Sequence, residues 1–306
     1  MNNSPLVTVI AINYNSEPYV LETLESIKQQ TYENIQLCII DDHSTDRSVD
    51  LIKQWLQTYQ RPYKITLNEK NLGICATLNK VFNQADGKYI SATATDDILL
   101  PDKISRQVEI MESAPNDVCA VYSNAYLVNS DGTFRDKTFI ERRNVQGYPQ
   151  GNIFETLLTD NFIPAMSVLL KNDSYKAVGN FDENLIYEDY DMWLRLSKKF
   201  KFIYSDYISV KYRVKAKSLS TAIDWDFPNA SILLKHANES AKALKKLQEL
   251  GLRAYTKKKT KVLELIKKSN VDDPYLRRLI LLNQLKIPVG IGLKFLPRSK
   301  PASVAV

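Results

Sequence analysis

The chain has 306 residues, of which 44% are hydrophobic and 25% are charged, and its formal net charge is +6. This length and composition indicate a globular chain that buries a sizeable core, as one large domain or a domain with an extension. No apolar run approaches the roughly 18 to 20 residues of a membrane-spanning helix. The polar start Met1-Asn2-Asn3-Ser4-Pro5 lacks the charged and apolar regions of a signal peptide, so we expect a cytoplasmic protein.

The positive charge is concentrated near the carboxyl terminus. Residues 227–306 carry 17 Lys and Arg against five Asp and Glu, whereas residues 1–226 carry 24 against 30. The chain is therefore an acidic body with a basic tail. Charge alone does not distinguish an anionic membrane surface from nucleic acid as the partner of such a tail.

Strand-like and helix-like segments alternate along the body. The apolar run at residues 6–12 predicts a buried strand, and apolar side chains follow it at helical spacing, at Val20, Leu21, Leu24 and Ile27. The alternation recurs three times, with strands at 35–40, 63–67 and 88–93 and helical patterns at 49–56, 78–82 and from Pro101 to Met111. Repeated βα units predict an α/β fold with a doubly wound, mostly parallel, Rossmann-like sheet and right-handed crossovers.

Cysteine and histidine give no sign of a metal site. Cys38, Cys75 and Cys119 are odd in number, lie within or beside apolar runs and lack metal-type spacing. We expect three buried free thiols rather than disulfides or zinc ligands. His43 and His236 have no partner at metal-ligand spacing either.

Polar side chains follow three of the four predicted strands, at the point where each strand ends. The segments are Asn13-Tyr14-Asn15, Asp41-Asp42-His43-Ser44-Thr45-Asp46 and Thr95-Asp96-Asp97. The carboxyl ends of parallel strands meet at one edge of a sheet, where open α/β sheets bind their ligands. The sequence therefore predicts a cleft rimmed by an aromatic ring and several carboxylates.

Asp96 and Asp97 are the most informative residues of this cleft. Two adjacent anions are costly unless positive charge is nearby, and a divalent cation with a diphosphate supplies it. The alternative is a solvated pair that caps the helix after Pro101. Tyr14 either stacks on a nucleobase or covers core, and Asp42 either accepts from a base or ribose or forms an Asx turn.

Taken in order, the motifs resemble those of family 2 glycosyltransferases over about residues 1–220. They are Val7-Thr8-Val9-Ile10 to Tyr14-Asn15, Asp41-Asp42-x-Ser44-x-Asp46, Asn71-Leu72-Gly73 before Asn79, Ala85-Asp86-Gly87-Lys88-Tyr89-Ile90 and Thr95-Asp96-Asp97. The resemblance implies a GT-A fold, a nucleoside-diphosphate sugar donor and a divalent cation, Mn²⁺ or Mg²⁺. It divides the chain into a glycosyltransferase domain at 1–226, with a nucleotide-binding half at 1–100 and an acceptor half at 101–226, and a basic amphipathic helical extension at 227–306.

The resemblance also implies roles for single residues. Those implied to bind the nucleotide sugar are Ile12, Tyr14, Asp41, Asp42, Asn71, Asp96 and Lys215. Metal ligation falls to Asp97 together with Asp96, because Ala94 stands where the family's Asp-x-Asp-Asp motif usually has its first aspartate. One carboxylate with phosphate oxygens and waters is still an acceptable shell for Mg²⁺ or Mn²⁺.

A second acidic element, Glu188-Asp189-Tyr190-Asp191, precedes the apolar pattern of a helix that begins near Asp189. Its carboxylates either cap this helix or carry chemistry. In the family this element holds the catalytic base. The resemblance implies that the base is Asp189, six residues before Arg195, with Asp191 as the second candidate.

Two further segments match the family. Asn161-Phe162-Ile163-Pro164-Ala165-Met166-Ser167 begins the acceptor half, which varies across the family, so the sugar and the acceptor are not readable. Tyr212-Arg213-Val214-Lys215 resembles the family's closing motif. Lys215 is either a diphosphate contact or an exposed loop lysine, and Arg213 has the same two interpretations.

Beyond Phe227 the tail is read from its pattern alone. Helical spacing runs from Ile232 to Leu250, a second helix is predicted over 252–268 and a third over 274–285. The final segment, residues 287–298, is apolar with basic flanks. This combination favours peripheral contact with an anionic membrane over nucleic acid, and packing on the protein or an oligomer interface are the alternatives.

These features predict an inverting, hexosyltransferase-type glycosyltransferase of bacterial surface polysaccharide synthesis, acting at the inner face of the plasma membrane on a glycan or lipid-linked acceptor. Asp189 would deprotonate the acceptor hydroxyl while the cation at Asp97 neutralises the leaving diphosphate. One alternative is a nucleotidyltransferase, which we expect to carry a Gly-rich basic loop where this chain has Asn13-Tyr14-Asn15. The other is a non-catalytic sugar-nucleotide-binding or membrane-binding module.

Overall fold

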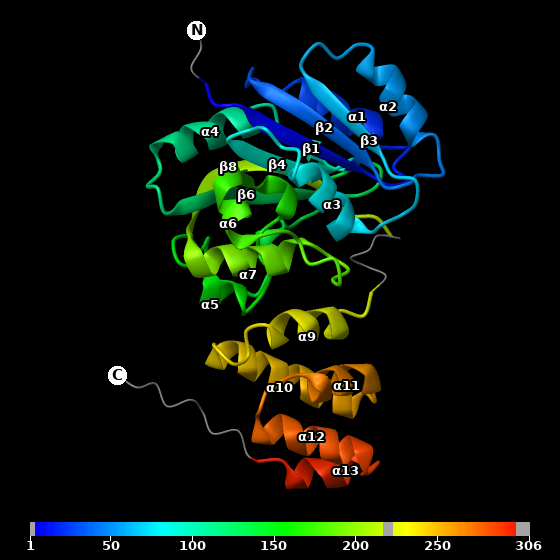
Figure 1. Cartoon of the computed structure of the whole chain (residues 1–306), viewed down its shortest axis with the longest axis vertical. Coiled ribbons are helices and arrows are strands. Elements are labelled where there is room, and N and C mark those ends of the chain that lie inside the picture. The colour runs from blue at the N-terminus through cyan, green and yellow to red at the C-terminus, as the bar shows by residue number, and fades with distance from the viewer. Residues whose placement is uncertain (1–3, 217–222, 298–306) are drawn as a thin grey trace. The chain divides into compact units, whose positions relative to one another are not determined.

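The computed structural model describes residues 4–216 and 223–297 (Figure 1). The chain divides into two compact units, residues 1–221 and 222–306. The first unit holds the sheet and the helices that cover it, and the described elements of the second unit are all helical. Each unit is considered by itself below.

The amino-terminal half of the first unit is built from βα units. Strands β1 (Val7–Asn13), β2 (Ile35–Asp41), β3 (Tyr63–Leu67) and β4 (Tyr89–Ala94) lie parallel in the order β3-β2-β1-β4. Helices α1 (Val20–Lys28), α2 (Ser48–Leu56) and α3 (Ile74–Phe82) return the chain between them. All four predicted strands are present. Strands β1, β2 and β4 are largely buried, as a parallel sheet covered on both faces requires, whereas β3 lies at the edge of the sheet and is mostly exposed.

The second half extends the same sheet with mixed directions. Strand β7 (Leu169–Lys171) lies antiparallel to β4 and to β6 (Val118–Val128), while β8 (Lys201–Arg213) is parallel to β6 and antiparallel to β5 (Ile98–Leu99). The full order is β3-β2-β1-β4-β7-β6-β8-β5. The sheet is thus mixed but mostly parallel, which confirms the predicted α/β class.

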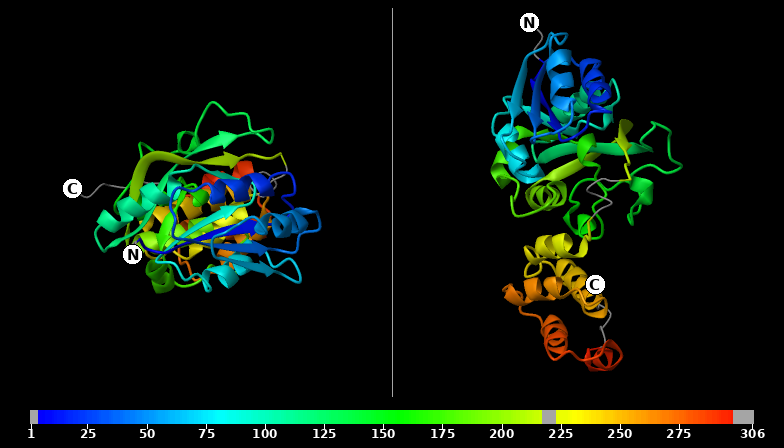
Figure 2. Two further views of the ribbon diagram at one scale, coloured as in Figure 1. Left: turned by 90° about the horizontal axis from the view of Figure 1, so that it is seen from above. Right: turned by 90° about the vertical axis from the view of Figure 1, so that its right-hand side faces the viewer.

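Helices cover both faces of this sheet (Figure 2). On β1, Val7, Val9 and Ala11 point into one core, which also contains buried side chains of α1, α2 and α4 (Lys103–Ser113). The opposite side of this unit carries α3, α6 (Asn172–Val178) and α7 (Asp189–Lys199). Contacts between the rings of Phe82, Tyr175 and Phe181 join α3 and α6 to the segment before α7. Shorter helices are α5 (Phe154–Leu157), η1 (Ile140–Arg142) and η2 (Ala165–Ser167).

Gly87 explains part of the motif that precedes β4. Its N–H donates to Thr8 Oγ1 at 3.0 Å, and a Cβ on Gly87 would lie 2.5 Å from the backbone nitrogen of Thr8. Only glycine leaves room for this approach between the start of β4 and β1. The motif therefore has a packing role at the edge of the sheet opposite the predicted cleft.

The structure corrects some helix boundaries. The helix expected to begin at Pro101 begins at Lys103, because Pro101 lies in the turn before it. The spacing from Ile232 to Leu250 belongs to two helices rather than one, α9 (Asp226–Leu234) and α10 (Ala241–Thr256), and the Ser240 hydroxyl caps the second by accepting from Ala243 N at 3.2 Å.

The predicted second helix of the tail is also displaced. Residues 252–256 complete α10, and α11 (Thr260–Lys268) starts after a turn in which Lys258 has a φ of +55°. The third, α12 (Pro274–Gln284), matches its prediction and begins with proline at its first turn. It is followed by α13 (Val289–Gly292) and η3 (Leu293–Phe295). The three cysteines are free and buried, as predicted.

Lys103 is an unexpected buried cation at the start of α4. Its ammonium donates to Ser91 Oγ at 2.7 Å, to Gln107 Oε1 at 2.9 Å and to the Val168 carbonyl at 3.4 Å. Burial disfavours the charged form and lowers the pKa of Lys103 to about 7. The folded protein thus holds a lysine that loses its proton near neutrality.

Replacing this lysine should change how stability depends on pH. Between about pH 7 and pH 10 the unfolded chain keeps the Lys103 proton and the folded chain releases it, so the free energy of unfolding rises by up to about 1.4 kcal/mol per pH unit. Lys103→Met should remove this rise, measured by urea denaturation at several pH values. The exposed control Lys53→Met should keep it. Equal slopes in the Lys103→Met variant and the native chain would contradict the assignment.

Candidate active site

Three of the predicted polar segments meet at one edge of the sheet. Asn13 lies beside Asp41 in the β1–β2 register, and Ile12 lies beside Ala94 in the β1–β4 register. The buried Asn13 amide joins the three strand ends, because it donates to Asp41 Oδ1 at 2.6 Å and accepts from Thr95 Oγ1 at 2.6 Å. The sequence singled out Asn13 only as part of a motif, but in the structure its side chain links the ends of β1, β2 and β4.

Tyr14 is presented to solvent by an ordered turn. Asn15, at a φ of +49°, donates its N–H to Ser44 Oγ at 2.9 Å and accepts from Thr45 N at 2.8 Å through its side chain. The Tyr14 ring beside this turn is 51% exposed. It therefore does not cover core and is available for stacking.

Asp41 and Asp42 are buried carboxylates that bind protein groups. Asp41 accepts from Asn13 and from the N–H and hydroxyl of Ser44, at 2.9 and 2.5 Å. Asp42 accepts from the Asn68 amide at 2.9 Å and from the backbone N–H groups of Leu72 and Gly73 at 2.8 and 3.0 Å.

Asp42 thereby holds the loop before α3 against the end of β2. Asn71 is exposed in this loop, and its Oδ1 accepts from Gly73 N at 3.1 Å. Ile12 is half-buried, and its carbonyl accepts from Thr95 N at 2.9 Å. The predicted nucleotide-binding residues of the first half thus lie around one strand edge, and several of them also fix the backbone there.

The Asp96–Asp97 pair is divided into a reachable and a buried carboxylate. The side chain of Asp97 is 1% exposed, and its Oδ1 accepts from Arg213 N at 2.9 Å. Asp96 is 16% exposed, and Lys215 Nζ lies 2.5 Å from its Oδ2. Burial, and then the negative charge of Asp96, raise the pKa of Asp97 well above the usual range.

Arg213 holds this pair in place. Its guanidinium donates to the Asp96 carbonyl at 3.0 Å, to Glu22 Oε2 at 2.6 Å and to the Asn129 and Ser130 carbonyls at 3.3 and 3.1 Å. The side chain is buried and fully engaged. The sequence predicted either a diphosphate contact or an exposed loop residue at Arg213. Its hydrogen bonds to four protein groups instead favour a structural role, which neither prediction included.

The acidic turn fits a cation that draws most of its ligands from elsewhere. Within residues 4–216 and 223–297, no three His, Cys, Asp or Glu side chains gather into a metal site. The Lys215 ammonium nevertheless shows that a positive charge fits against Asp96. One carboxylate, phosphate oxygens of a ligand and waters suffice for Mg²⁺ or Mn²⁺.

Asp189 is the first residue of α7 and is held in a fixed orientation. Its Oδ1 accepts from Tyr190 N at 2.6 Å, and its Oδ2 accepts from Asn161 Nδ2 at 3.0 Å. Burial raises the pKa of Asp189, and burial together with the Asp189 charge raises that of the adjacent Glu188. A positioned carboxylate with a raised pKa suits general-base catalysis.

Asp191 is committed to a different task. Its buried carboxylate accepts from Arg195 Nε at 2.8 Å. The other guanidinium nitrogens of Arg195 donate to the carbonyls of Val178, Gly179 and Asn180. This ion pair fixes the turn between α6 and the acidic element, and it favours Asp189 over Asp191 as the candidate base.

Helix α3 connects the two halves of the candidate site. Its amino end follows the loop that Asp42 holds, and its side chains bind the segment that precedes α7. Asn79 exchanges hydrogen bonds with the Phe181 backbone, at 3.0 and 2.9 Å, and donates to Glu183 Oε1 at 2.9 Å. Cys75 Sγ donates to the Leu185 carbonyl at 3.4 Å.

Comparison with known proteins identifies relatives along most of the first unit. The sequence matches the family model described as glycosyl transferase family 2 over residues 8–176. An uncharacterized glycosyltransferase of Methanocaldococcus jannaschii is 31% identical over 216 residues, 69% of this chain and 72% of that protein. TuaG of Bacillus subtilis, whose name provisionally assigns it to teichuronic acid biosynthesis, is 29% identical over 199 residues, 65% of this chain and 74% of that protein.

Solved structures share the fold at low sequence identity. S. aureus TarS 1–349 in complex with UDP-GlcNAc has a TM-score of 0.58 at 14% identity, covering 94% of this chain and 75% of that one. The mannosyltransferase PcManGT of Pyrobaculum calidifontis, in complex with GDP-Man and Mn²⁺, has a TM-score of 0.59 at 16% identity, covering 96% and 73%. These likenesses confirm the predicted GT-A fold.

The two aspartates of α7 should differ in what they contribute to stability. Asp191→Asn breaks a buried ion pair and should lower the free energy of unfolding by about 2 kcal/mol. Asp189→Asn relieves repulsion between the adjacent half-buried carboxylates of Glu188 and Asp189 and should cost less than about 0.5 kcal/mol. Chemical denaturation at about pH 8 measures both. The reverse order would contradict this division.

Proposed function

The chain belongs to glycosyl transferase family 2, and from that membership we propose that it is an inverting glycosyltransferase of the hexosyltransferase type. It moves a sugar from a nucleoside-diphosphate sugar to a hydroxyl of a glycan or lipid-linked acceptor. The observation that carries the proposal is the fixed orientation of the Asp189 carboxylate, which accepts hydrogen bonds from Asn161 and from Tyr190 N. Asp191, by contrast, forms an ion pair with Arg195.

In this proposal the donor binds at the ends of β1, β2 and β4. The exposed Tyr14 ring is available to stack on the base, and Asp41, Asp42 and Asn71 shape the edge beside it. The bound UDP-GlcNAc of TarS and GDP-Man of PcManGT support a nucleotide sugar as the donor class. Asp96 and Lys215 then lie near the diphosphate and the transferred sugar.

We propose that Asp96 would hold the cation, Mn²⁺ or Mg²⁺, whereas the resemblance assigned its ligation first to Asp97, which is buried. This places the reachable carboxylate toward the ligand, whereas the buried Asp97 fixes the turn through Arg213 N. The cation supplies positive charge to the leaving diphosphate. Lys215, released from Asp96, adds a second positive charge near the same phosphates.

Asp189 removes the proton from the acceptor hydroxyl as that oxygen attacks the anomeric carbon. Attack from the face opposite the leaving group inverts the configuration and requires no second protein acid, because a nucleoside diphosphate leaves without protonation by the protein. Asn161 keeps the Asp189 carboxylate in its orientation and favours its ionised form.

The acceptor and the location are proposed from the name of one relative and from the charge of the second unit. The name of the TuaG relative and the basic helical unit both favour a surface polysaccharide pathway at the cytoplasmic face of the membrane. Family membership disfavours the nucleotidyltransferase alternative. The non-catalytic alternative differs from the proposal in what it expects of Asp189 variants.

A panel of nucleotide sugars should identify the donor by thermal shift. We expect one nucleoside diphosphate and its sugar to raise the melting temperature more with Mn²⁺ than without it, since ligands that bind only the folded state stabilise it. Asp96→Asn should lose the Mn²⁺-dependent part, and the exposed helix control Asp50→Asn should keep it. If no nucleotide stabilises the native chain in a metal-dependent way, the proposal fails.

Turnover should depend on Asp189 and respond to Asn161. Asp189→Asn should preserve donor stabilisation and lower the release of nucleoside diphosphate by at least about 100-fold, the usual scale of a general base. Asn161→Ala removes a donor that lowers the pKa of Asp189, so the acidic limb of the kcat profile should move to higher pH.

Asn184→Ala is the matched control for Asn161→Ala. The Asn184 side chain is exposed in the same half of the unit and donates to Asp182 Oδ1 at 2.9 Å. Its replacement should leave the pH profile unchanged. Full turnover in Asp189→Asn would instead favour a non-catalytic role for this carboxylate.

A further inference from the structure

Helix α12 carries apolar side chains on two faces. Leu276, Leu279 and Leu282 are buried and pack within the helical unit. Leu281 and Leu285, four residues apart, are 53% and 61% exposed. One apolar stripe is enough to join a helix to its own unit, so the second stripe has no partner among the described residues of that unit.

The segment after α12 continues this exposure. Ile291, Leu293 and Phe295, in α13 and η3, are 52%, 44% and 63% exposed. Together with Leu281 and Leu285 they form what we term the α12–η3 surface. Single exposed apolar residues are ordinary, but five large ones within fifteen residues of chain indicate an interaction surface.

The α12–η3 surface is presented by a fixed backbone. Tyr255 of α10 donates its hydroxyl to the Ile287 carbonyl at 2.8 Å, and a Cβ on Gly292 would lie 2.1 Å from the same hydroxyl and displace it. Arg278 Nη1 donates to the Phe295 carbonyl at 3.3 Å. These contacts join α13 and η3 to α10 and α12, so the apolar side chains are held outward by structure.

The charge of this segment has one sign. Residues 274–297 contain Arg277, Arg278, Lys286 and Lys294 and no Asp or Glu. Arg277 is paired with Asp272 at 2.9 Å, just outside the segment. The remaining cations flank exposed leucine, isoleucine and phenylalanine side chains, which is the composition of an interfacial membrane element.

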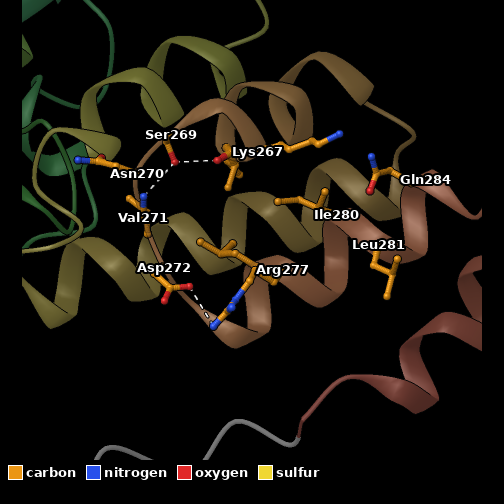
Figure 3. A pocket seen from close by; sticks show the side chains of 11 residues that line it. Lys267, Ser269, Asn270, Val271, Asp272, Arg277, Ile280, Leu281 and Gln284 are labelled. Atoms are coloured by element: carbon orange, nitrogen blue, oxygen red, sulfur yellow. Dashed lines mark hydrogen bonds and ion pairs between the residues drawn. The ribbon is translucent and has the colours of Figure 1, made fainter.

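A neighbouring pocket of ≈ 490 Å³ does not offer an alternative ligand site (Figure 3). Its charged pair, Arg277 and Asp272, is closed on itself, and Ser269 donates to the Ile266 carbonyl at 2.7 Å. Leu281 is the member that the pocket shares with the α12–η3 surface. The candidate interaction site of this region is therefore the α12–η3 surface and not the pocket.

We propose that the α12–η3 surface binds an anionic lipid bilayer, with its apolar side chains in the headgroup region and its cations against lipid phosphates. Within residues 4–216 and 223–297, no helix is long and apolar enough to cross a bilayer, so the contact is interfacial. A second copy of the chain would bring two cationic segments together, which like-charge repulsion disfavours. Nucleic acid would leave the five apolar side chains without apolar contacts.

Vesicle flotation of the full chain tests this proposal. We expect binding to vesicles that contain phosphatidylglycerol, little binding to pure phosphatidylcholine, and loss of binding as salt is raised. The double variant Leu285→Ser, Phe295→Ser should lower partitioning by about tenfold or more, since it removes two large apolar contacts. Phe134→Ser, which replaces an exposed phenylalanine of the first unit, is the matched control and should bind normally.

Three results would overturn the proposal. They are unchanged binding by the double variant, equal binding to neutral and anionic vesicles, or a concentration-dependent dimer that the double variant abolishes, which would identify a second copy as the partner. Light scattering measures the last. The nucleotide-dependent thermal shift of the double variant should equal that of the native chain, so failure of the lipid proposal and failure of the proposed function are seen separately.

Discussion

The arrangement of the candidate site depends on the buried guanidinium of Arg213. It joins the last residue of β8 to the turn that carries Asp96 and Asp97, to Glu22 of α1 and to the carbonyls of residues 129–130. A planar group with five donors can bind several acceptors at once, and an ammonium cannot reproduce that geometry. Because its backbone N–H also holds Asp97, one residue sets both the position of the acidic turn and the direction in which each aspartate points.

The site concentrates carboxylates, and the fold compensates each of them differently. Asp41 and Asp42 are stabilised by hydrogen bonds from amides and a hydroxyl, whereas Asp191 forms an ion pair with Arg195 and Asp96 forms one with Lys215. Asp189 receives two hydrogen bonds and no direct ion pair that the structure shows. A carboxylate shielded from water without a paired cation accepts a proton more readily than an ion-paired one, so Asp189 is better prepared for this role than Asp191.

Much of this could be predicted from the sequence, where the determining interactions are local. Strands β1 to β4 lie where the apolar, β-branched and aromatic residues of the sequence indicate, and α7 begins at Asp189 as its apolar spacing indicates. The partners of the acidic residues could not be predicted, because Arg213 is 116 residues from Asp97 and Asn161 is 28 residues from Asp189. The division of the tail into α9 and α10 also escaped the pattern, since the helical spacing continues across the break that Ser240 caps.

Helix α3 sets the distance between the two sides of the site. Its nine residues span about 13 Å at the rise of an α-helix. The distance between the loop held by Asp42 and the segment held by Asn79 is therefore set by covalent geometry rather than by loop conformation. Insertion of one residue into α3 would turn one end by about 100° relative to the other and misplace one of the two anchors. Loops elsewhere in the chain can vary in length without this penalty, but this helix cannot.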